Sequence, residues 1–272
     1  MIRQVVRLRT FLSRVVNWCL GKIGYALVRT TTTSHHVALR RIEHLGRTYA
    51  YENVVILDAY APWAVDDEFQ SIWALIERNT LVDILRGYEL YQVVRESADL
   101  PGDILEVGVW RGASAAILAA AARRWMPEAR IWLCDTFTGV VKAGEHDSHY
   151  RGGEHADTTV GMVESLLGRM GVTKAQILVG VFPDETGAEI ANQQIALCHI
   201  DVDVYQSAAD IVAWLAPRMP CGGILVFDDY GVSSCKGITR LVDELRESGT
   251  WRYFYNVNKH AILIKRSSPS LS

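Results

Sequence analysis

Four aspartates stand in two close pairs, each directly after a short apolar stretch of the sequence. Asp201 and Asp203 follow one such stretch, and Asp228 and Asp229 follow another. If the two stretches form neighbouring strands, whose axes lie about 4.8 Å apart, the carboxylates share one pocket. Like charges this close cannot all stay ionised without a partner, and neither pair includes a lysine or an arginine. Because oxygen ligands favour Mg²⁺, Mn²⁺ or Ca²⁺ over zinc, the pattern predicts a divalent cation. The alternative is that the aspartates cap the helices that follow.

A glycine-rich turn follows the apolar stretch at residues 104–107. Glu106 stands two residues before Gly108, and Gly112 completes the pattern E-x-G-x-x-x-G. A strand that ends in glycines and a helix start is a ligand site of open α/β sheets, and glycines allow the backbone to approach the ligand. A dinucleotide site would show G-x-G-x-x-G, which this turn lacks. Asp135, at the end of a second apolar stretch, is placed to accept hydrogen bonds from ribose hydroxyls; a helix cap or loop aspartate is the alternative.

Alternating strand-like and helix-like segments position these motifs. Short apolar stretches predict strands, and segments with apolar residues on one face predict helices. Their alternation predicts a doubly wound α/β fold of the Rossmann type, with a mostly parallel seven-stranded sheet closed by an antiparallel hairpin. The predicted strands are 104–107, 130–135, 177–179, 196–200, 224–227, 252–257 and 261–265, and the predicted helices are 66–78, 80–98, 115–124, 157–169, 207–215 and 236–247.

The composition limits the class of protein. The 272 residues suffice for one large domain or a domain with an appendage. A net charge of −3 gives no indication of a nucleic-acid partner, and five cysteines without C-x-x-C pairs indicate a reducing compartment. We expect a cytoplasmic protein in three parts: an N-terminal helix and linker at residues 1–34, a helical cap region at 35–100, and the main domain at 101–272.

The N-terminal segment, residues 1–29, carries six basic residues and no acidic one. On a helical wheel the basic and apolar side chains lie on different sides, which predicts an amphipathic helix suited to an anionic membrane surface. Peripheral contact with the inner membrane surface is one interpretation. The other is a helix packed on its own domain or on a second subunit. Basic residues interrupt every apolar run, so we expect neither a membrane span nor a signal peptide.

Four motifs together resemble those of the macrocin and mycinamicin sugar O-methyltransferases. They are the stretch 103–114, D-T-F-T-G at 135–139, H-I-D-V-D-V-Y at 199–205 and F-D-D-Y at 227–230. That family also includes an aminocoumarin-sugar methyltransferase, and catechol O-methyltransferase is similar more distantly. The resemblance covers roughly residues 80–247, and its most specific part is the pairing of D-x-D-x-Y with D-D-Y.

The resemblance implies a class I methyltransferase fold that uses S-adenosylmethionine and Mg²⁺ or another divalent cation. It implies that Asp201, Asp228 and Asp229 ligate the metal and that Asp203 is the general base. Glu106 would lie at the methionine end of the cofactor. The residues that it implies for cofactor binding are Thr80, Glu106, Gly108, Trp110, Arg111, Gly112, Ser114, Asp135, Thr136, Phe137, Gly180, Phe182 and Asp201.

The acceptor stays open at this point. Val140 and Val141 stand where family members often have Leu-Pro or Phe-Pro, Thr136 stands where they often have serine, and the long loop at 142–157 is particular to this chain. We expect methylation of a sugar hydroxyl in a glycosylated natural product or glycan, by a homo-oligomer. A catechol-like acceptor, a nucleotide-dependent oxidoreductase and a non-catalytic membrane-surface protein are the alternatives.

Overall fold

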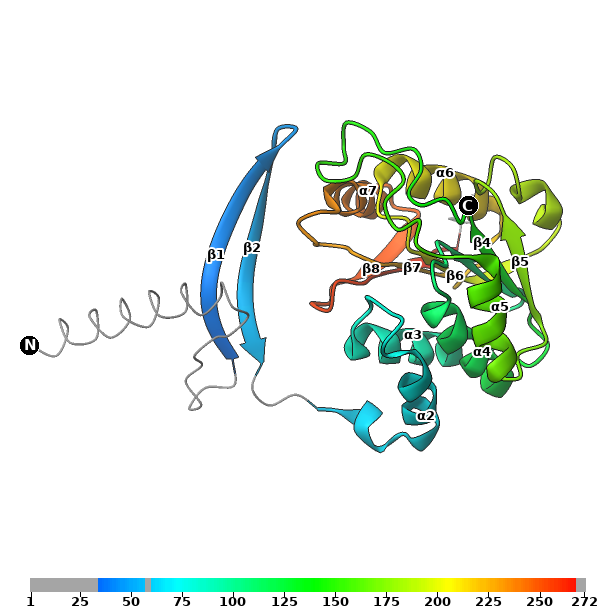
Figure 1. The fold of residues 1–272 in the computed structure, drawn as a ribbon. Helices are drawn as coiled ribbons and strands as arrows, with labels where there is room; N and C mark the ends of the chain where they lie inside the picture. The colour runs from blue at the N-terminus through cyan, green and yellow to red at the C-terminus, as the bar shows by residue number, and fades with distance from the viewer. Residues whose placement is uncertain (1–33, 57–59, 268–272) are drawn as a thin grey trace, which may run out of the picture. The chain divides into compact units, whose positions relative to one another are not determined.

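The computed structural model describes residues 34–56 and 60–267 (Figure 1). The chain divides into two compact units, with the boundary between Pro62 and Trp63. The larger unit contains a seven-stranded sheet in the order β5-β4-β3-β6-β7-β9-β8. The five strands from β5 to β7 are parallel, β9 runs antiparallel to β7, and β8 runs antiparallel to β9. The strands are β3 (Asp103–Val107), β4 (Ile131–Asp135), β5 (Ala175–Val179), β6 (Ile195–Ile200), β7 (Ile224–Phe227), β8 (Trp251–Phe254) and β9 (Ala261–Lys265).

Helices cover both faces of this sheet, as Figure 1 shows, so the predicted doubly wound α/β fold is confirmed. Neighbouring strand residues point to opposite faces: Ile104 packs in one apolar layer and Leu105 in the other. The first layer contains α2, α3, α4 and α5, and the second contains α6 and α7. The helices are α2 (Asp67–Ile76), α3 (Ile84–Glu96), α4 (Ala113–Trp125), α5 (Val160–Arg169), α6 (Tyr205–Leu215) and α7 (Lys236–Glu247), with short 3-10 turns η1 (Pro62–Val65), η2 (Gly187–Ile190) and η3 (Ala216–Arg218).

The helical cap predicted for residues 35–100 is wrong in its first part. β1 (Ser34–His44) and β2 (Arg47–Ile56) form an antiparallel hairpin, and the helices α2 and α3 occupy only the remainder. Leu45 and Gly46 connect the strands with positive φ angles of 47° and 74°, the conformation that a tight two-residue hairpin requires. The basic helix predicted at residues 1–29 lies outside the described residues. Within 34–56 and 60–267, no helix combines the length and apolarity needed to cross a bilayer.

Candidate active site

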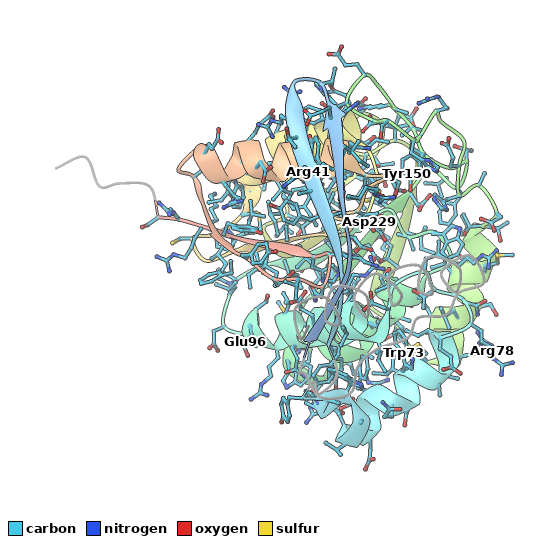
Figure 2. The ribbon with its side chains drawn as sticks, turned by 90° about the vertical axis from the view of Figure 1, so that its left-hand side faces the viewer. Arg41, Trp73, Arg78, Glu96, Tyr150 and Asp229 are labelled. Carbon is cyan, nitrogen blue, oxygen red and sulfur yellow. The ribbon has the colours of Figure 1, made fainter. Side chains whose placement is uncertain are left out.

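A pocket lies at the carboxyl ends of the parallel strands, where open α/β sheets bind their ligands. It is lined by backbone and side chains from the ends of β3, β4, β6 and β7 and from the turn before α3. Figure 2 shows Tyr150 and Asp229 in this part of the molecule. The predicted residues that line the pocket are Thr80, Gly108, Trp110, Ser114, Asp135, Thr136, Gly180, Phe182, Asp201, Asp203, Asp228 and Asp229. Four further predicted residues, Glu106, Arg111, Gly112 and Phe137, are outside this lining.

The two glycines of the turn are required by the protein's own backbone. Gly108 has a φ of +89°, and a Cβ atom there would lie 1.8 Å from the backbone oxygen of Asp201. The turn therefore crosses the end of β6 at close range, and because Gly108 also lines the pocket, its approach to a ligand stays a prediction. Gly112 has a φ of +84° and forms the left-handed N-cap of α4. Glycine reaches this conformation without the strain that a side chain adds.

Asp135 holds the glycine turn in place. Its Oδ2 accepts hydrogen bonds from the backbone N–H groups of Val109 at 2.7 Å and Trp110 at 2.8 Å. Its Oδ1 accepts one from Phe137 at 2.7 Å. A carboxylate has further lone pairs, so the contact with a ribose hydroxyl remains a prediction for this residue.

Glu106 is fully buried beneath the pocket. Its Oε1 lies 2.9 Å from Nδ1 of His199, which is also fully buried. Because its side chain pairs with His199 and is outside the pocket lining, an internal role for Glu106 competes with the predicted contact with the methionine end of the cofactor. No role was predicted for His199, although a histidine inside the apolar strand I-A-L-C-H-I is a visible signal in the sequence.

Arg111 and Trp110 fasten the end of the long loop. Trp110 Nε1 donates to Oδ1 of Asp157 at 2.9 Å, and the Arg111 guanidinium pairs with the same carboxylate. The guanidinium also stacks over the indole, 4.5 Å from the ring centroid. The role of Arg111 in the fold is thus to anchor this loop beside the pocket.

The aspartates of the two pairs converge in the pocket as predicted. Asp203 and Asp229 have positive φ angles of 65° and 59°, a strained conformation that is concentrated at functional sites. Burial raises the pKa of Asp201 well above its usual range, and the charge of Asp228 raises it further. Burial and the charges of Asp228 and Asp203 raise the pKa of Asp229 to about 7. The pKa of Asp203 is also raised, chiefly by burial.

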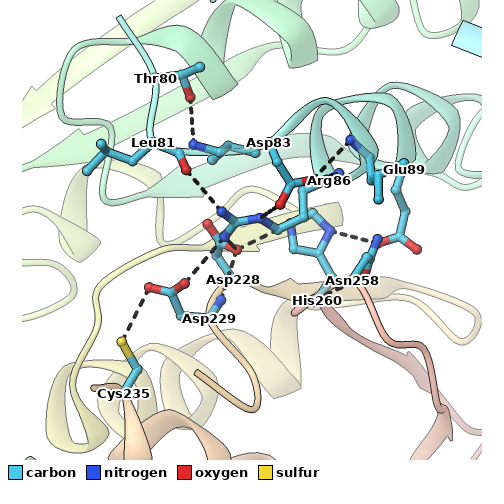
Figure 3. Close-up of polar contacts among 12 residues, drawn as sticks. Thr80, Leu81, Asp83, Arg86, Glu89, Asp228, Asp229, Cys235, Asn258 and His260 are labelled. Carbon is cyan, nitrogen blue, oxygen red and sulfur yellow. Dashed lines mark hydrogen bonds and ion pairs between the residues drawn. The ribbon is translucent and has the colours of Figure 1, made fainter. Parts of the chain in front are cut away.

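Arg86, on α3, supplies a positive charge that the sequence motifs did not reveal (Figure 3). Its Nη1 pairs with Oδ1 of Asp228 and lies 3.3 Å from Oδ1 of Asp229. Burial alone would raise the pKa of Asp228, but the charges of His260 and Arg86 lower it below its usual value. Arg86 Nη2 also donates to the backbone oxygen of Leu81 at 3.0 Å, which holds the turn before α3 against the site.

That turn corrects the predicted helix at 80–98. Asp83 caps α3 by accepting hydrogen bonds from the N–H groups of Leu85 and Arg86, so the helix begins at Ile84. Residues 80–82 are therefore free of the helix and line the pocket, Thr80 among them.

The long loop contributes a second unpredicted residue, Tyr150. Its buried hydroxyl donates a hydrogen bond to Oδ1 of Asp203 at 2.7 Å. On the other side, Cys235 Sγ lies 3.3 Å from Oδ2 of Asp229. Tyr150 and His155 of the loop line the pocket, as expected for a binding loop, together with Val140 and Val141 just before it.

Comparison with known proteins decides the family. The model of the macrocin-O-methyltransferase (TylF) family matches residues 73–254. The chain belongs to this family. It is accordingly an S-adenosylmethionine-dependent O-methyltransferase, and the oxidoreductase and non-catalytic alternatives are set aside.

Two similar proteins are O-methyltransferases named for a rhamnosyl-tetracenomycin and for mycinamicin III. The 8-demethyl-8-(2,3-dimethoxy-alpha-L-rhamnosyl)-tetracenomycin-C 4'-O-methyltransferase of Streptomyces olivaceus is 32% identical over 199 residues, which cover 64% of this chain and 76% of that protein. The mycinamicin III 3''-O-methyltransferase of Micromonospora griseorubida is 27% identical over 172 residues, 58% of this chain and 67% of that protein. The solved structure of the O-methyltransferase NovP shares the fold, with a TM-score of 0.59 and 23% identity over 69% of this chain and 82% of that chain.

Proposed function

We propose that the enzyme methylates a hydroxyl group on the sugar of a glycosylated small molecule and that a divalent cation, Mg²⁺ in the first place, is required. The proposal rests on four carboxylates that share one pocket. The guanidinium of Arg86 pairs with two of them, Asp228 and Asp229, and offsets only part of their negative charge. The acceptor class is supported by relatives whose names specify rhamnosyl and mycinamicin acceptors.

The residues present fit a hard divalent cation. Asp201, Asp228 and Asp229 offer only oxygen atoms, the ligands that Mg²⁺ prefers. Raised pKa values at Asp201 and Asp229 indicate negative charge that the surrounding protein does not balance. These three residues would hold the cation, which when bound lowers the pKa of a hydroxyl beside it.

The pocket also fits S-adenosylmethionine. The backbone of the glycine turn and the carboxylate of Asp135 line the pocket beside Gly180 and Phe182, so polar and apolar groups are both available to the cofactor. When bound, it supplies an activated methyl group, and the organic chemistry belongs to the cofactor. The contribution of the chain is to align the acceptor oxygen for in-line transfer and to exclude water.

Asp203 is the general base of this proposal. An aspartate with a reference pKa of about 3.9 is a weak base for a sugar hydroxyl, so it needs an acceptor whose proton has been loosened. Tyr150 donates a hydrogen bond to Oδ1 of Asp203, which orients the carboxylate that takes the acceptor proton. The proton moves from the acceptor hydroxyl to Asp203 as the oxygen gains its methyl group.

The test is methyl transfer from labelled S-adenosylmethionine to a panel of rhamnosides, other deoxysugar glycosides and catechols, using the full chain. We expect label on a sugar hydroxyl, loss of transfer in EDTA and recovery with added MgCl₂. Full transfer by metal-stripped enzyme would refute the cation, and transfer to catechols alone would refute the sugar acceptor.

One variant, compared with a matched control, tests Asp203 as the general base. Asp203→Asn should lower kcat by about 10²–10⁴-fold, the usual contribution of a positioned general base, while leaving S-adenosylhomocysteine affinity nearly unchanged. Asp99→Asn is the matched control, because this aspartate is exposed and lies outside the pocket. A loss confined to KM in Asp203→Asn would assign the residue to acceptor binding.

A further inference from the structure

A row of buried polar residues continues one apolar face of the sheet. Glu106 pairs in register with His199, and His199 pairs with Val226. Because strand residues two apart share a face, Asp228 follows Val226 onto the same face. His260 lies directly before Ala261, which pairs with Phe227. Because neighbouring strand residues point to opposite faces, His260 lies on the same face as Asp228 and belongs to the row. The row spans the ends of β3, β6, β7 and β9, and none of its four members is more than 4% exposed.

Both imidazoles of this row are oriented by a carboxylate. His199 Nδ1 lies 2.9 Å from Oε1 of Glu106, and His260 Nδ1 lies 2.7 Å from Oε2 of Glu89 on α3. Asn258 Nδ2 donates to the same oxygen of Glu89 at 2.8 Å and holds it in place (Figure 3). A carboxylate at Nδ1 orients the imidazole with its N–H toward that carboxylate, so that Nε2 carries the lone pair whenever the ring is neutral.

The two Nε2 atoms are then the ring nitrogens left for a ligand. Among the described residues, both are buried atoms without a hydrogen-bond partner. His199, His260 and Asp228 each offer one ligand atom, and the three atoms lie within 4.8 Å of one another. His260 Nε2 is 3.5 Å from Oδ1 of Asp228, longer than a hydrogen bond of normal length. When both imidazoles are neutral, three electron-pair donors converge in this buried space, an arrangement that a bound cation stabilises.

We infer that His199 Nε2, His260 Nε2 and a carboxylate oxygen of Asp228 form a second cation site, for a transition metal ion of the Zn²⁺ type. Imidazole ligands suit Zn²⁺, Co²⁺, Ni²⁺ and Fe²⁺, and not Mg²⁺. The pairs Glu106–His199 and Glu89–His260 have the carboxylate–histidine arrangement that supports metal-bound histidines. The ion ties β6, β7 and β9 together beneath the pocket. The site differs from the all-oxygen site of the proposed function and does not depend on it, and Asp228 has two oxygens to share between them.

Arg86 determines the strength of this site. Its guanidinium pairs with Oδ1 of Asp228, the oxygen nearest to His260. A bound metal ion must compete with that positive charge or move it aside. Replacing Arg86 by the uncharged and similarly long methionine should therefore tighten metal binding, whereas a purely structural role for the two histidines predicts no such gain.

The experiment uses the full chain, produced without a histidine tag, stripped with a chelator and titrated with Co²⁺ in a large excess of Mg²⁺. We expect one Co²⁺ per chain, with a visible ligand-field band and imidazole scattering in X-ray absorption. Glu89→Gln, which removes only an orienting charge, should weaken Co²⁺ by about 10–100-fold. His199→Gln and His260→Gln should weaken it further, and Arg86→Met should strengthen it several-fold.

His149→Gln is the matched control, because this histidine is exposed on the long loop, and it should bind Co²⁺ as the unchanged protein does. The spectrum of the unchanged protein decides the question even if the buried histidine variants fail to fold. Absence of Co²⁺ binding by the folded unchanged protein would overturn the inference. Undiminished binding in folded His199→Gln and His260→Gln would overturn it as well.

Discussion

The carboxylate of Asp229 lies between one cation and several anions. Arg86 Nη1 is 3.3 Å from its Oδ1, while burial and the charges of Asp228 and Asp203 oppose its ionisation and raise its pKa to about 7. The reference pKa of an aspartate is about 3.9. Between about pH 4 and pH 7, Asp229 is therefore protonated in the folded, metal-free protein and ionised in the unfolded chain.

This difference sets the direction of a pH effect on stability. Because the pKa is raised in the folded state, the stabilisation is fully present below about pH 4 and is lost as the pH rises to about 7. In EDTA, Asp229→Asn should be as stable as the unchanged protein near pH 4 and more stable at pH 8. The gain should be of the order of 2–4 kcal/mol, measured by urea denaturation.

The control is Asp99→Asn, because Asp99 is exposed and lies outside the pocket lining. The difference in unfolding free energy between this variant and the unchanged protein should not increase with pH. A constant offset between Asp229→Asn and the unchanged protein from pH 4 to pH 8 would contradict the assigned titration.

Substitutions at Asp135 and Glu106 should have different effects, the first on cofactor affinity and the second on the free energy of unfolding. Asp135 lines the pocket, whereas Glu106 is buried against His199. Asp135→Ala should weaken S-adenosylhomocysteine by about 1.5–3 kcal/mol in calorimetry, the value of a hydrogen bond to a charged group. Glu106→Gln should leave that affinity within a few-fold and lower the free energy of unfolding instead. The reverse pattern would assign the direct cofactor contact to Glu106.

At the scale of elements, the glycine turn after β3 crosses the end of β6 at very short range. The backbone oxygen of Asp201 occupies the space where a side chain at position 108 would begin. The turn, the end of β6 and the aspartate pair that follows it are therefore positioned as one unit, since no side chain separates the two backbones.

Gly108→Ala tests this crossing. The added methyl group would overlap Asp201 at 1.8 Å and would strain a φ of +89°, so we expect a loss of about 3 kcal/mol or more in unfolding free energy. Gly161→Ala in α5 is the matched control, because nothing lies within 4 Å of the added atom. Alanine in a helix should stabilise it by up to about 1 kcal/mol. Equal stabilities of the two variants in chemical denaturation would contradict the crossing as described.

At the scale of the whole molecule, the methyltransferase fold is contained in the larger of the two units. The family match at residues 73–254 lies entirely within the unit that begins at Trp63. The smaller unit adds the hairpin of β1 and β2 and the basic N-terminal segment. The segment at residues 1–29 thus lies outside the part of the chain that the family match covers.

We propose that residues 1–29 bind the surface of anionic membranes. Each of the six basic residues should contribute about 1 kcal/mol near such a surface. Co-sedimentation with phosphatidylglycerol vesicles should be strong at low salt, weaken as salt is added, and disappear when residues 1–29 are removed. Phosphatidylcholine vesicles are the control. Equal pelleting with both lipids, or none with either, would favour a helix packed on protein.

The sequence by itself determined the sheet, the glycine turn and the convergence of the aspartate pairs. Apolar stretches, turn residues and strand-end positions act over short distances along the chain, so Asp201, Asp203, Asp228 and Asp229 could be placed together from their neighbours alone. The hairpin at 34–56 was missed because its mixed residues showed no clear period and its two-residue turn was not recognised.

Only the tertiary structure decided what surrounds the carboxylates. Arg86 reaches Asp228 across 142 positions of sequence, and Glu89 reaches His260 across 171. These contacts depend on how α3 packs on the sheet face that also carries Glu106 and His199. Such packing is set by the whole core and by no local pattern, which is why the neutralising guanidinium and the buried histidines became visible only in the folded chain.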